Sequence, residues 1–175
     1  MIPELMNRTW SHAAIVAVSA LLSACVAAPS AEERADEQEL ANTYKEHAND
    51  SPVPSPMAWT EPAQPVTGEA VAYTTVDGKQ IQGWMARPAN INQDAVGELP
   101  ALVVIHQWWG LDDSIRRAAE RLSGEGYVTL AVDMYNGQVA TQPKDAMKMS
   151  RALSQDKPAG LANIEDAIAY LKNQG

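Results

Sequence analysis

The sequence predicts an α/β domain, in which a mostly parallel sheet is flanked by helices, and three stretches carry this prediction. Residues 100–105, PALVVI, form a short uninterrupted apolar run that is typical of a strand buried on both faces. Residues 110–126 follow with apolar residues at helical spacing, and residues 127–135, YVTLAVDMY, form a second strand-like run. Strands that alternate with helices indicate a βαβ unit and hence a parallel sheet.

A hairpin precedes this unit and two helices follow it. Two β-rich runs flank Asp77 and Gly78, and Asp-Gly between such runs is a strong hairpin signal. Residues 143–154 are expected to be helical, with Pro143 in the first turn, and residues 159–174 form a clearer helix. The residues expected on the apolar stripe of this last helix are Leu161, Ile164, Ile168 and Leu171.

The helix within residues 110–126 has start and stop signals. Asp112 or Asp113 can cap its first turn, and Gly124 or Gly126 can end it. The residues expected to share its apolar face are Ile115, Ala119 and Leu122.

The composition excludes several classes of function. The 175 residues carry a formal net charge of −9, whereas phosphate binding needs clustered Lys and Arg, so no nucleic-acid partner is expected. Cys25 is the single cysteine, which excludes an intramolecular disulfide and a zinc site built from several cysteines. No other pattern implies a metal or a cofactor, and none sets an oligomeric state.

Residues 1–24 have the character of an export signal. The apolar run of residues 13–22 is shorter than the ~20 residues that a transmembrane helix needs, but it fits the apolar centre of a signal peptide. The signal ends in LSAC, residues 22–25, which resembles the bacterial lipobox. That resemblance implies that Cys25 is lipidated and becomes the first residue of the mature protein; a plain signal peptide with a coincidental cysteine is the alternative.

Residues 25–66 are predicted to be a lipid-anchored tether. Their first half is acidic and can form at most a solvated helix, and five prolines between Pro52 and Pro65 favour an extended spacer. Val26 stands where an Asp would favour retention in the inner membrane. By resemblance to Gram-negative sorting rules, we expect an exported protein anchored in the outer membrane and facing the periplasm.

Motifs in the order and spacing of a known family run through the middle of the chain. Residues 106–111 read HQWWGL, residues 126–127 read GY, and residues 131–137 read AVDMYNG. They resemble the motifs H-E-x-x-G-L, G-Y and P-D-L-Y-x-G of the dienelactone hydrolase family of α/β-hydrolases. The resemblance covers the predicted domain, residues 67–175, as the N-terminal part of such a fold.

The resemblance implies hydrolysis of a small ester or lactone by a Cys or Ser nucleophile, an Asp and a His, in that chain order. The nucleophile of such an enzyme lies in a G-x-C-x-G or G-x-S-x-G elbow, and the chain contains neither sequence. We therefore expect the sheet to be truncated before the nucleophile strand, with the triad beyond Gly175. Residues 102–105, which pair with that strand in α/β-hydrolases, would present an open apolar edge and make the chain poorly soluble.

The resemblance also assigns roles to the turn after the first strand. The backbone N–H of Trp108 would be one donor of the oxyanion hole. Gln107 stands where many family members have a Glu that contacts the resting nucleophile, and an amide cannot carry that negative charge. The side chains of Trp108, Trp109 and Tyr135 would line an apolar substrate pocket; for the two tryptophans, core packing under the loop is the alternative.

His106 precedes any possible elbow, whereas the family's histidine comes last in the chain. We therefore expect a structural histidine at a strand end, hydrogen-bonded to nearby backbone. Asp133 follows the second strand at its carboxyl end, where α/β sites gather, and it is expected to orient the loop together with Tyr135.

Two functions are compatible with this sequence. The first is a lipid-anchored envelope hydrolase of ester or lactone bonds, whose triad is missing from this chain. The second is a non-catalytic envelope lipoprotein that uses the α/β scaffold for binding, or an inactive fragment.

Lipidation at Cys25 has a direct test. The wild-type chain should incorporate radiolabelled palmitate in a bacterial host, and globomycin should block its processing. Cys25→Ser should lose the label, because a hydroxyl does not replace the thiol that accepts the lipid. Equal labelling of the two chains would disprove the lipobox prediction.

Overall fold

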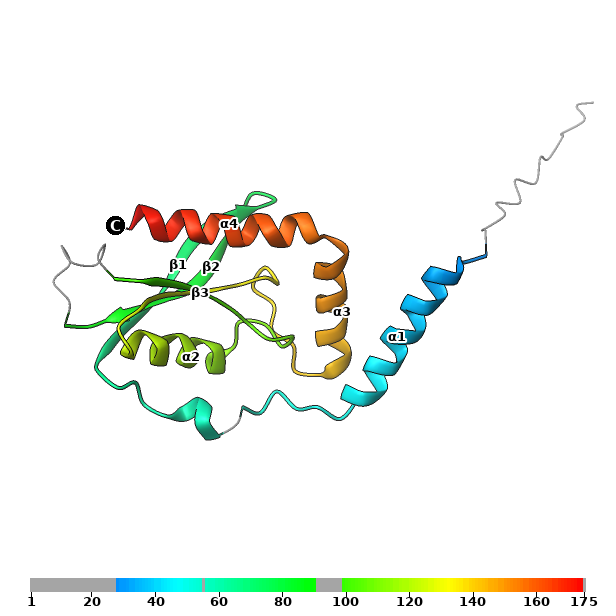
Figure 1. Cartoon of the computed structure of the whole chain (residues 1–175), viewed down its shortest axis with the longest axis horizontal. Helices are drawn as coiled ribbons and strands as arrows, with labels where there is room; N and C mark the ends of the chain where they lie inside the picture. Colours follow the sequence, from blue (N-terminus) through cyan, green and yellow to red (C-terminus); the bar gives the residue numbers. More distant parts are fainter. Residues whose placement is uncertain (1–27, 55, 91–98, 175) are drawn as a thin grey trace, which may run out of the picture.

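The computed structural model describes residues 28–54, 56–90 and 99–174, so the predicted export signal and Cys25 lie outside the described residues. Figure 1 shows the arrangement of the elements. In chain order they are α1 (Ala31–His47), the 3-10 helix η1 (Pro56–Trp59), β1 (Val66–Val76), β2 (Lys79–Pro88), β3 (Ala101–Ile105), α2 (Asp113–Gly124), β4 (Val128–Val132), α3 (Pro143–Gln155) and α4 (Lys157–Asn173). Among the described helices, none has both the length and the apolar character needed to cross a membrane.

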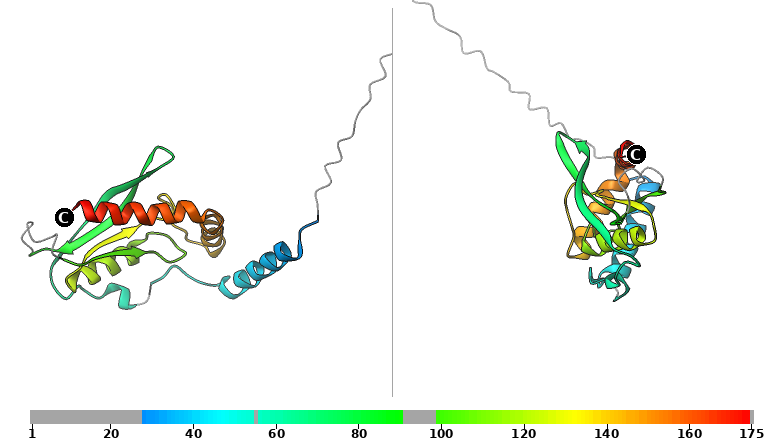
Figure 2. Two further views of the ribbon diagram at one scale, coloured as in Figure 1. Left: turned by 45° about the horizontal axis from the view of Figure 1, so that its top comes forward. Right: turned by 90° about the vertical axis from the view of Figure 1, so that its left-hand side faces the viewer.

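One mixed sheet forms the centre of the fold. Its strands lie in the order β1-β2-β4-β3, with the β3–β4 pair parallel and the other two pairs antiparallel. The parallel strands are connected by α2, which completes the predicted βαβ unit. Figures 1 and 2 show α4 on one face of the sheet and α2 on the other. The predicted α/β fold class is therefore confirmed.

The predicted hairpin joins β1 and β2. Asp77 and Gly78 form its turn with φ angles of 50° and 77°. Positive φ at both central residues is the geometry of the hairpin turn that follows the right-handed twist of paired strands, and it explains why an Asp-Gly pair stands there.

β4 is the most buried element of the fold, since all five of its residues are buried. On the α4 side of the sheet, Leu130 and Val132 contribute to an apolar cluster that includes Ile81 from β2 and both Ala167 and Leu171 from α4. On the α2 side, a second cluster joins β4 to α2 and β2. The strand that is buried on both faces of the sheet is therefore β4.

β3 differs from the prediction of a strand buried on both faces. Within the described sheet it pairs only with β4, so it is an edge strand, and its residues are partly buried or exposed. Ile105, at its carboxyl end, is 54% exposed. The open apolar edge predicted for residues 102–105 is thus present among the described strands.

The apolar stripe predicted for α4 is wrong in detail. The residues that α4 buries are Gly160, Asn163, Ala167 and Leu171. Leu161 and Ile168 are 62% and 41% exposed, and only Leu171 of the predicted stripe is buried. Small side chains let the helix approach the sheet closely, and Asn163 must face inward to reach its buried hydrogen-bond partners. Hydrophobicity alone does not reveal either constraint.

α2 begins and ends at the predicted signals. Asp112 is its N-cap and Gly124 is its last residue. Ala119 is fully buried and Ile115 packs beside it, as expected. Leu122, which was assigned to the same face, is 37% exposed.

The first half of the tether region forms the solvated helix that the sequence allows, and the Pro-rich half is more structured than predicted. α1 starts with a capping box in which Ser30 and Glu33 bond each other's backbone N–H, and the helix buries no residue. The Pro-rich stretch of residues 52–65 is not a free spacer, because part of it lies against α2. The Gln64 side chain donates to the Gly124 carbonyl at 2.9 Å.

The β3 edge generates a prediction about solubility. Ile105→Lys should reduce aggregation, because a charge on an exposed edge opposes pairing with another chain. The free energy of unfolding should change by no more than about 0.5 kcal/mol, as is usual at exposed positions. Val103→Lys is the matched control. Val103 lies in the same strand but packs, partly buried, against the hydrophobic core, so this substitution should destabilise the fold. Light scattering and denaturant titration measure both effects; unchanged scattering for Ile105→Lys would argue against an aggregating edge.

Candidate active site

The turn of residues 107–110 connects the carboxyl end of β3 to α2. It is closed by a hydrogen bond from the Gly110 N–H to the Gln107 carbonyl, at 3.2 Å. Gly110 has a φ of 101°, and a Cβ at this position would lie 2.6 Å from the backbone oxygen of Gln138. Only glycine satisfies both constraints, so the G of the HQWWGL motif is required by the shape of this turn.

His106 is buried just before the turn, and both of its ring nitrogens contact backbone. Nδ1 lies 2.6 Å from the Gln107 carbonyl, which can only accept, so Nδ1 carries the proton. Nε2 accepts from the Met134 N–H at 3.1 Å. The ring also meets the Tyr135 ring edge-on at 4.6 Å between centroids. His106 is therefore the structural histidine that the sequence predicts.

Gln107 and Trp108 occupy the accessible side of the turn. The Gln107 residue is exposed and Trp108 is half-buried. In the described part of the chain, no hydrogen bond uses the Trp108 backbone N–H, whereas the Trp109 carbonyl accepts from Ala140 N–H at 2.8 Å. The predicted oxyanion donor thus lies in a turn whose other backbone groups hold its shape.

The three residues predicted to line a substrate pocket do not converge on one cavity. Trp108 lines a groove of about 360 Å³ between α1 and α3, Trp109 lines a groove of about 580 Å³ beside α2, and Tyr135 lines a cavity of about 220 Å³ beside α3 and α4. The Trp109 side chain is 3% exposed and packs with Ala140 and Ala146. Its ring centroid lies 5.0 Å from that of Trp108, so the indoles form a small core under the loop.

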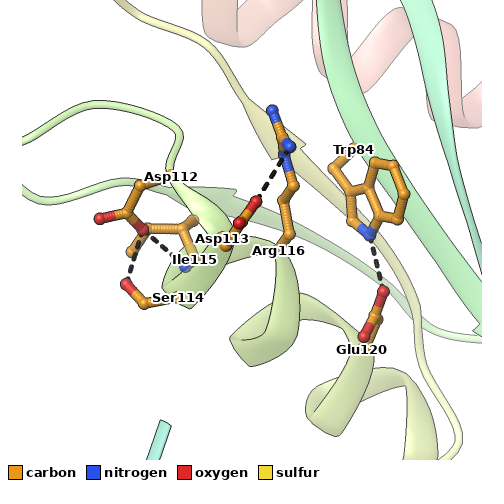
Figure 3. Close-up of polar contacts among 7 residues, drawn as sticks. All are labelled: Trp84, Asp112, Asp113, Ser114, Ile115, Arg116 and Glu120. Carbon is orange, nitrogen blue, oxygen red and sulfur yellow. Dashed lines mark hydrogen bonds and ion pairs between the residues drawn. The ribbon is translucent and has the colours of Figure 1, made fainter. Parts of the chain in front are cut away.

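The start of α2 is held firmly below the turn (Figure 3). Asp112 Oδ1 accepts from the Ile115 N–H at 3.1 Å and from the Ser114 hydroxyl at 2.6 Å. One turn along the helix, the Arg116 guanidinium lies over the Trp84 ring of β2, 5.6 Å from its centroid. The cap fixes the first turn of the helix, and the cation–π contact connects the helix to β2 of the sheet.

Asp133 organises the loop that follows β4. Its carboxylate accepts from the backbone N–H groups of Tyr135, at 2.9 Å, and of Gly137. Its own backbone carbonyl accepts from the Asn163 amide at 3.1 Å, and its N–H donates to the Tyr73 hydroxyl at 3.1 Å. The loop-orienting role predicted for Asp133 is confirmed, and burial raises the pKa of the neighbouring Tyr135 phenol.

Sequence reasoning missed the buried pair that supports this loop. The Tyr73 hydroxyl of β1 donates to Asn163 Oδ1 of α4 at 2.6 Å. Burial raises the pKa of Tyr73 to about 12. The available signal was an asparagine within the predicted helix, because such a residue usually has a specific hydrogen-bond partner when it is buried.

The chemistry that this arrangement offers is hydrogen-bond donation from a backbone N–H and from the Gln107 amide. Among the described residues, no Ser or Thr hydroxyl is hydrogen-bonded to a histidine, and no group of three or more His, Cys, Asp or Glu side chains could hold a metal ion.

The Tyr73 phenol generates a prediction about stability and pH. Its folded pKa of about 12 lies above its ordinary value of 10.0, so its contribution to stability is fully present below pH 10 and is lost as the pH rises through 12. Tyr73→Phe should lower the free energy of unfolding near neutral pH and flatten its decline above pH 10. Denaturant titrations across this range measure the slope, with Tyr44→Phe on the exposed α1 as the control. A Tyr73→Phe slope equal to that of the wild type would contradict the assignment.

Comparisons with known proteins agree with this architecture. Residues 81–175 match the Dienelactone hydrolase family. A protein of Aquifex aeolicus named "Putative carboxymethylenebutenolidase" is 36% identical over 76 residues, which make up 42% of this chain and 30% of that protein. A protein of the same name from Saccharolobus solfataricus is 39% identical over 59 residues, or 34% of this chain and 20% of that protein. The solved structure of m3DLH has a TM-score of 0.53 and 28% identity, over 61% of this chain and 42% of that chain.

The chain thus spans less than half the length of each of these proteins. The matched residues make up more than half of this chain, and they include most of β2, the parallel β3–β4 pair and the turn of residues 107–110. On this basis the chain belongs to the dienelactone hydrolase family.

Proposed function

We propose that this chain is the N-terminal part of a hydrolase of small esters or lactones, in which the turn after β3 stabilises the oxyanion. The observation that supports this role is that no described group accepts a hydrogen bond from the Trp108 N–H. The turn that carries this N–H is held by hydrogen bonds to the Gln107 carbonyl. Acyl transfer develops negative charge on the former carbonyl oxygen. A fixed backbone N–H aimed at that oxygen lowers the barrier, because it needs no reorganisation during the reaction.

The peptide between Gln107 and Trp108 is the element that must be held still. Its carbonyl accepts from two donors, His106 Nδ1–H and Gly110 N–H. In a trans peptide the carbonyl and the N–H point in opposite directions, so fixing the carbonyl inward turns the Trp108 N–H outward. His106 is therefore a positioning residue in this proposal: it connects the turn to Met134 after β4 and takes no proton from substrate.

Gln107 defines how the nucleophile would be activated. Its neutral amide can donate or accept a hydrogen bond, but it cannot supply the negative charge that a Glu would bring to a thiol. We expect the missing nucleophile to be activated mainly by its own histidine and aspartate, at positions beyond the part of the family fold that this chain covers.

The proposal extends to location. A lipid on Cys25 would hold the protein at the outer membrane, facing the periplasm, and several acyl chains would make a firm anchor, at roughly 0.8 kcal/mol per buried methylene. α1, which buries no residue, would then stand between the membrane and the domain.

A non-catalytic binding protein is the second candidate. It is favoured by the three aromatic side chains, which line three different cavities and form no common substrate pocket. The two candidates differ in whether the Trp108 N–H contributes to turnover.

The oxyanion role is tested in a chimera in which residues 28–175 replace the matching N-terminal part of the Aquifex aeolicus protein. Trp108→Pro removes the N–H at a turn position that proline tolerates, and Trp108→Ala removes the indole but keeps the N–H. Relative to Trp108→Ala, Trp108→Pro should lower kcat on p-nitrophenyl acetate by about 100- to 1000-fold, as expected for one lost oxyanion donor.

The 175-residue chain alone is the control and should show no turnover above background. Equal kcat values for the two chimera variants would reject the oxyanion role. A chimera that folds and binds substrate but never turns it over would favour the binding protein.

A further inference from the structure

Residues 51–54 and 56–65, which we name the strap, lie along one face of α2. The ring of Trp59 sits under the Arg117 guanidinium, 5.1 Å from its carbon. The Thr60 hydroxyl accepts from Arg121 Nη1 at 3.1 Å. Arg117 and Arg121 are one helical turn apart, so the two contacts follow the same stripe of the helix. The strap therefore runs beside α2 in a defined register.

Gly124 continues this stripe and makes the closest contact. Its carbonyl accepts from the Gln64 side chain at 2.9 Å. A Cβ at Gly124 would lie 2.8 Å from the Pro62 Cβ and 2.9 Å from the Ala63 backbone nitrogen. Since the second of these atoms is backbone, a side chain at 124 cannot be accommodated unless the strap moves. The absence of a side chain at this helix end is what lets the strap lie flat.

The other end of the strap reaches the proposed oxyanion turn. Residues 51–54 line a groove of about 580 Å³ whose opposite side is formed by β3, the turn and α2, including Ile105, His106 and Gln107. On the far side of the turn, the His47 ring meets the Trp108 ring edge-on at 5.4 Å between centroids. The segment before the sheet thus borders the turn on two sides.

The strap's proline content explains why it packs here without pairing. Proline has no N–H and cannot extend a sheet ladder, so the strap can lie near the exposed end of β3 without adding a strand. It leaves the groove open in front of Gln107. Its wall there is mainly apolar, from Pro52, Val53 and Pro54.

We propose that the strap forms one wall of the groove at Gln107 and thereby determines which groups can reach the oxyanion turn. A substrate enters the groove between residues 51–54 and the turn. The contacts of the strap with α2 set the width of this groove and thereby limit the size of the substrate. The strap lies before residues 81–175, which match the family. Its role in substrate access rests on the proposed function, but its docking does not.

Gly124→Ala tests the docking in the 175-residue chain. Alanine is favourable in a helix, so α2 should be retained while the strap is displaced. Hydroxyl-radical footprinting read by mass spectrometry should show oxidation of Trp109 and Ile115, which line the groove, rising severalfold. Tyr170 of α4, on the opposite face of the sheet (Figure 1), should keep its reactivity.

Two further variants make the outcome decisive. Trp59→Ala removes the contact with Arg117 at a partly exposed position and should give the same footprint as Gly124→Ala. Gly160→Ala in α4 is the matched control, because its Cβ would meet only side-chain atoms, those of Leu153 in α3 and of Met134. Unchanged reactivity of Trp109 and Ile115 in both strap variants, or an equal rise in the control, would overturn the proposal. This readout needs no turnover, so failure of the strap and failure of the hydrolase chimera are separate results.

Discussion

The structure depends on the burial of β4 between two neighbouring strands, β2 and β3. Every residue of this strand is buried, so its backbone groups must be paired on both sides, by β2 in one direction and by β3 in the other. The parallel pairing with β3 brings the carboxyl ends of the two strands to one edge of the sheet. The turn of residues 107–110 and the loop organised by Asp133 are adjacent for this reason.

A single imidazole turns that adjacency into a fixed geometry. His106 receives a hydrogen bond from the backbone after β4 and donates one to the turn after β3. The loop on the β4 side is held in turn by the Asp133 carboxylate and by the buried Tyr73–Asn163 pair. The rigidity of the proposed oxyanion donor therefore comes from groups other than the Trp108 N–H itself.

The N-terminal region adds a layer outside this scaffold. Helix α2 serves both parts, since one face packs on the sheet and another holds the strap through Arg117, Arg121 and Gly124. A segment whose composition suggests a passive spacer is thus placed beside the turn. The difference arises because proline content prevents regular structure but does not prevent docking on a suitable helix face.

The sequence by itself determined the fold class, the hairpin at Asp77 and Gly78, the limits of α2 and the structural role of His106. The first three of these features depend on local chemistry, namely positive φ, capping and apolar periodicity, whereas the role of His106 was implied by the family resemblance. The tertiary structure alone decided that β4 and not β3 is the fully buried strand, which face of α4 is buried, and which cavities Trp108, Trp109 and Tyr135 line. Those outcomes depend on how closely small residues let the helices approach the sheet. They also depend on contacts between residues that are distant in the chain, such as Tyr73 and Asn163, and no local sequence pattern encodes such contacts.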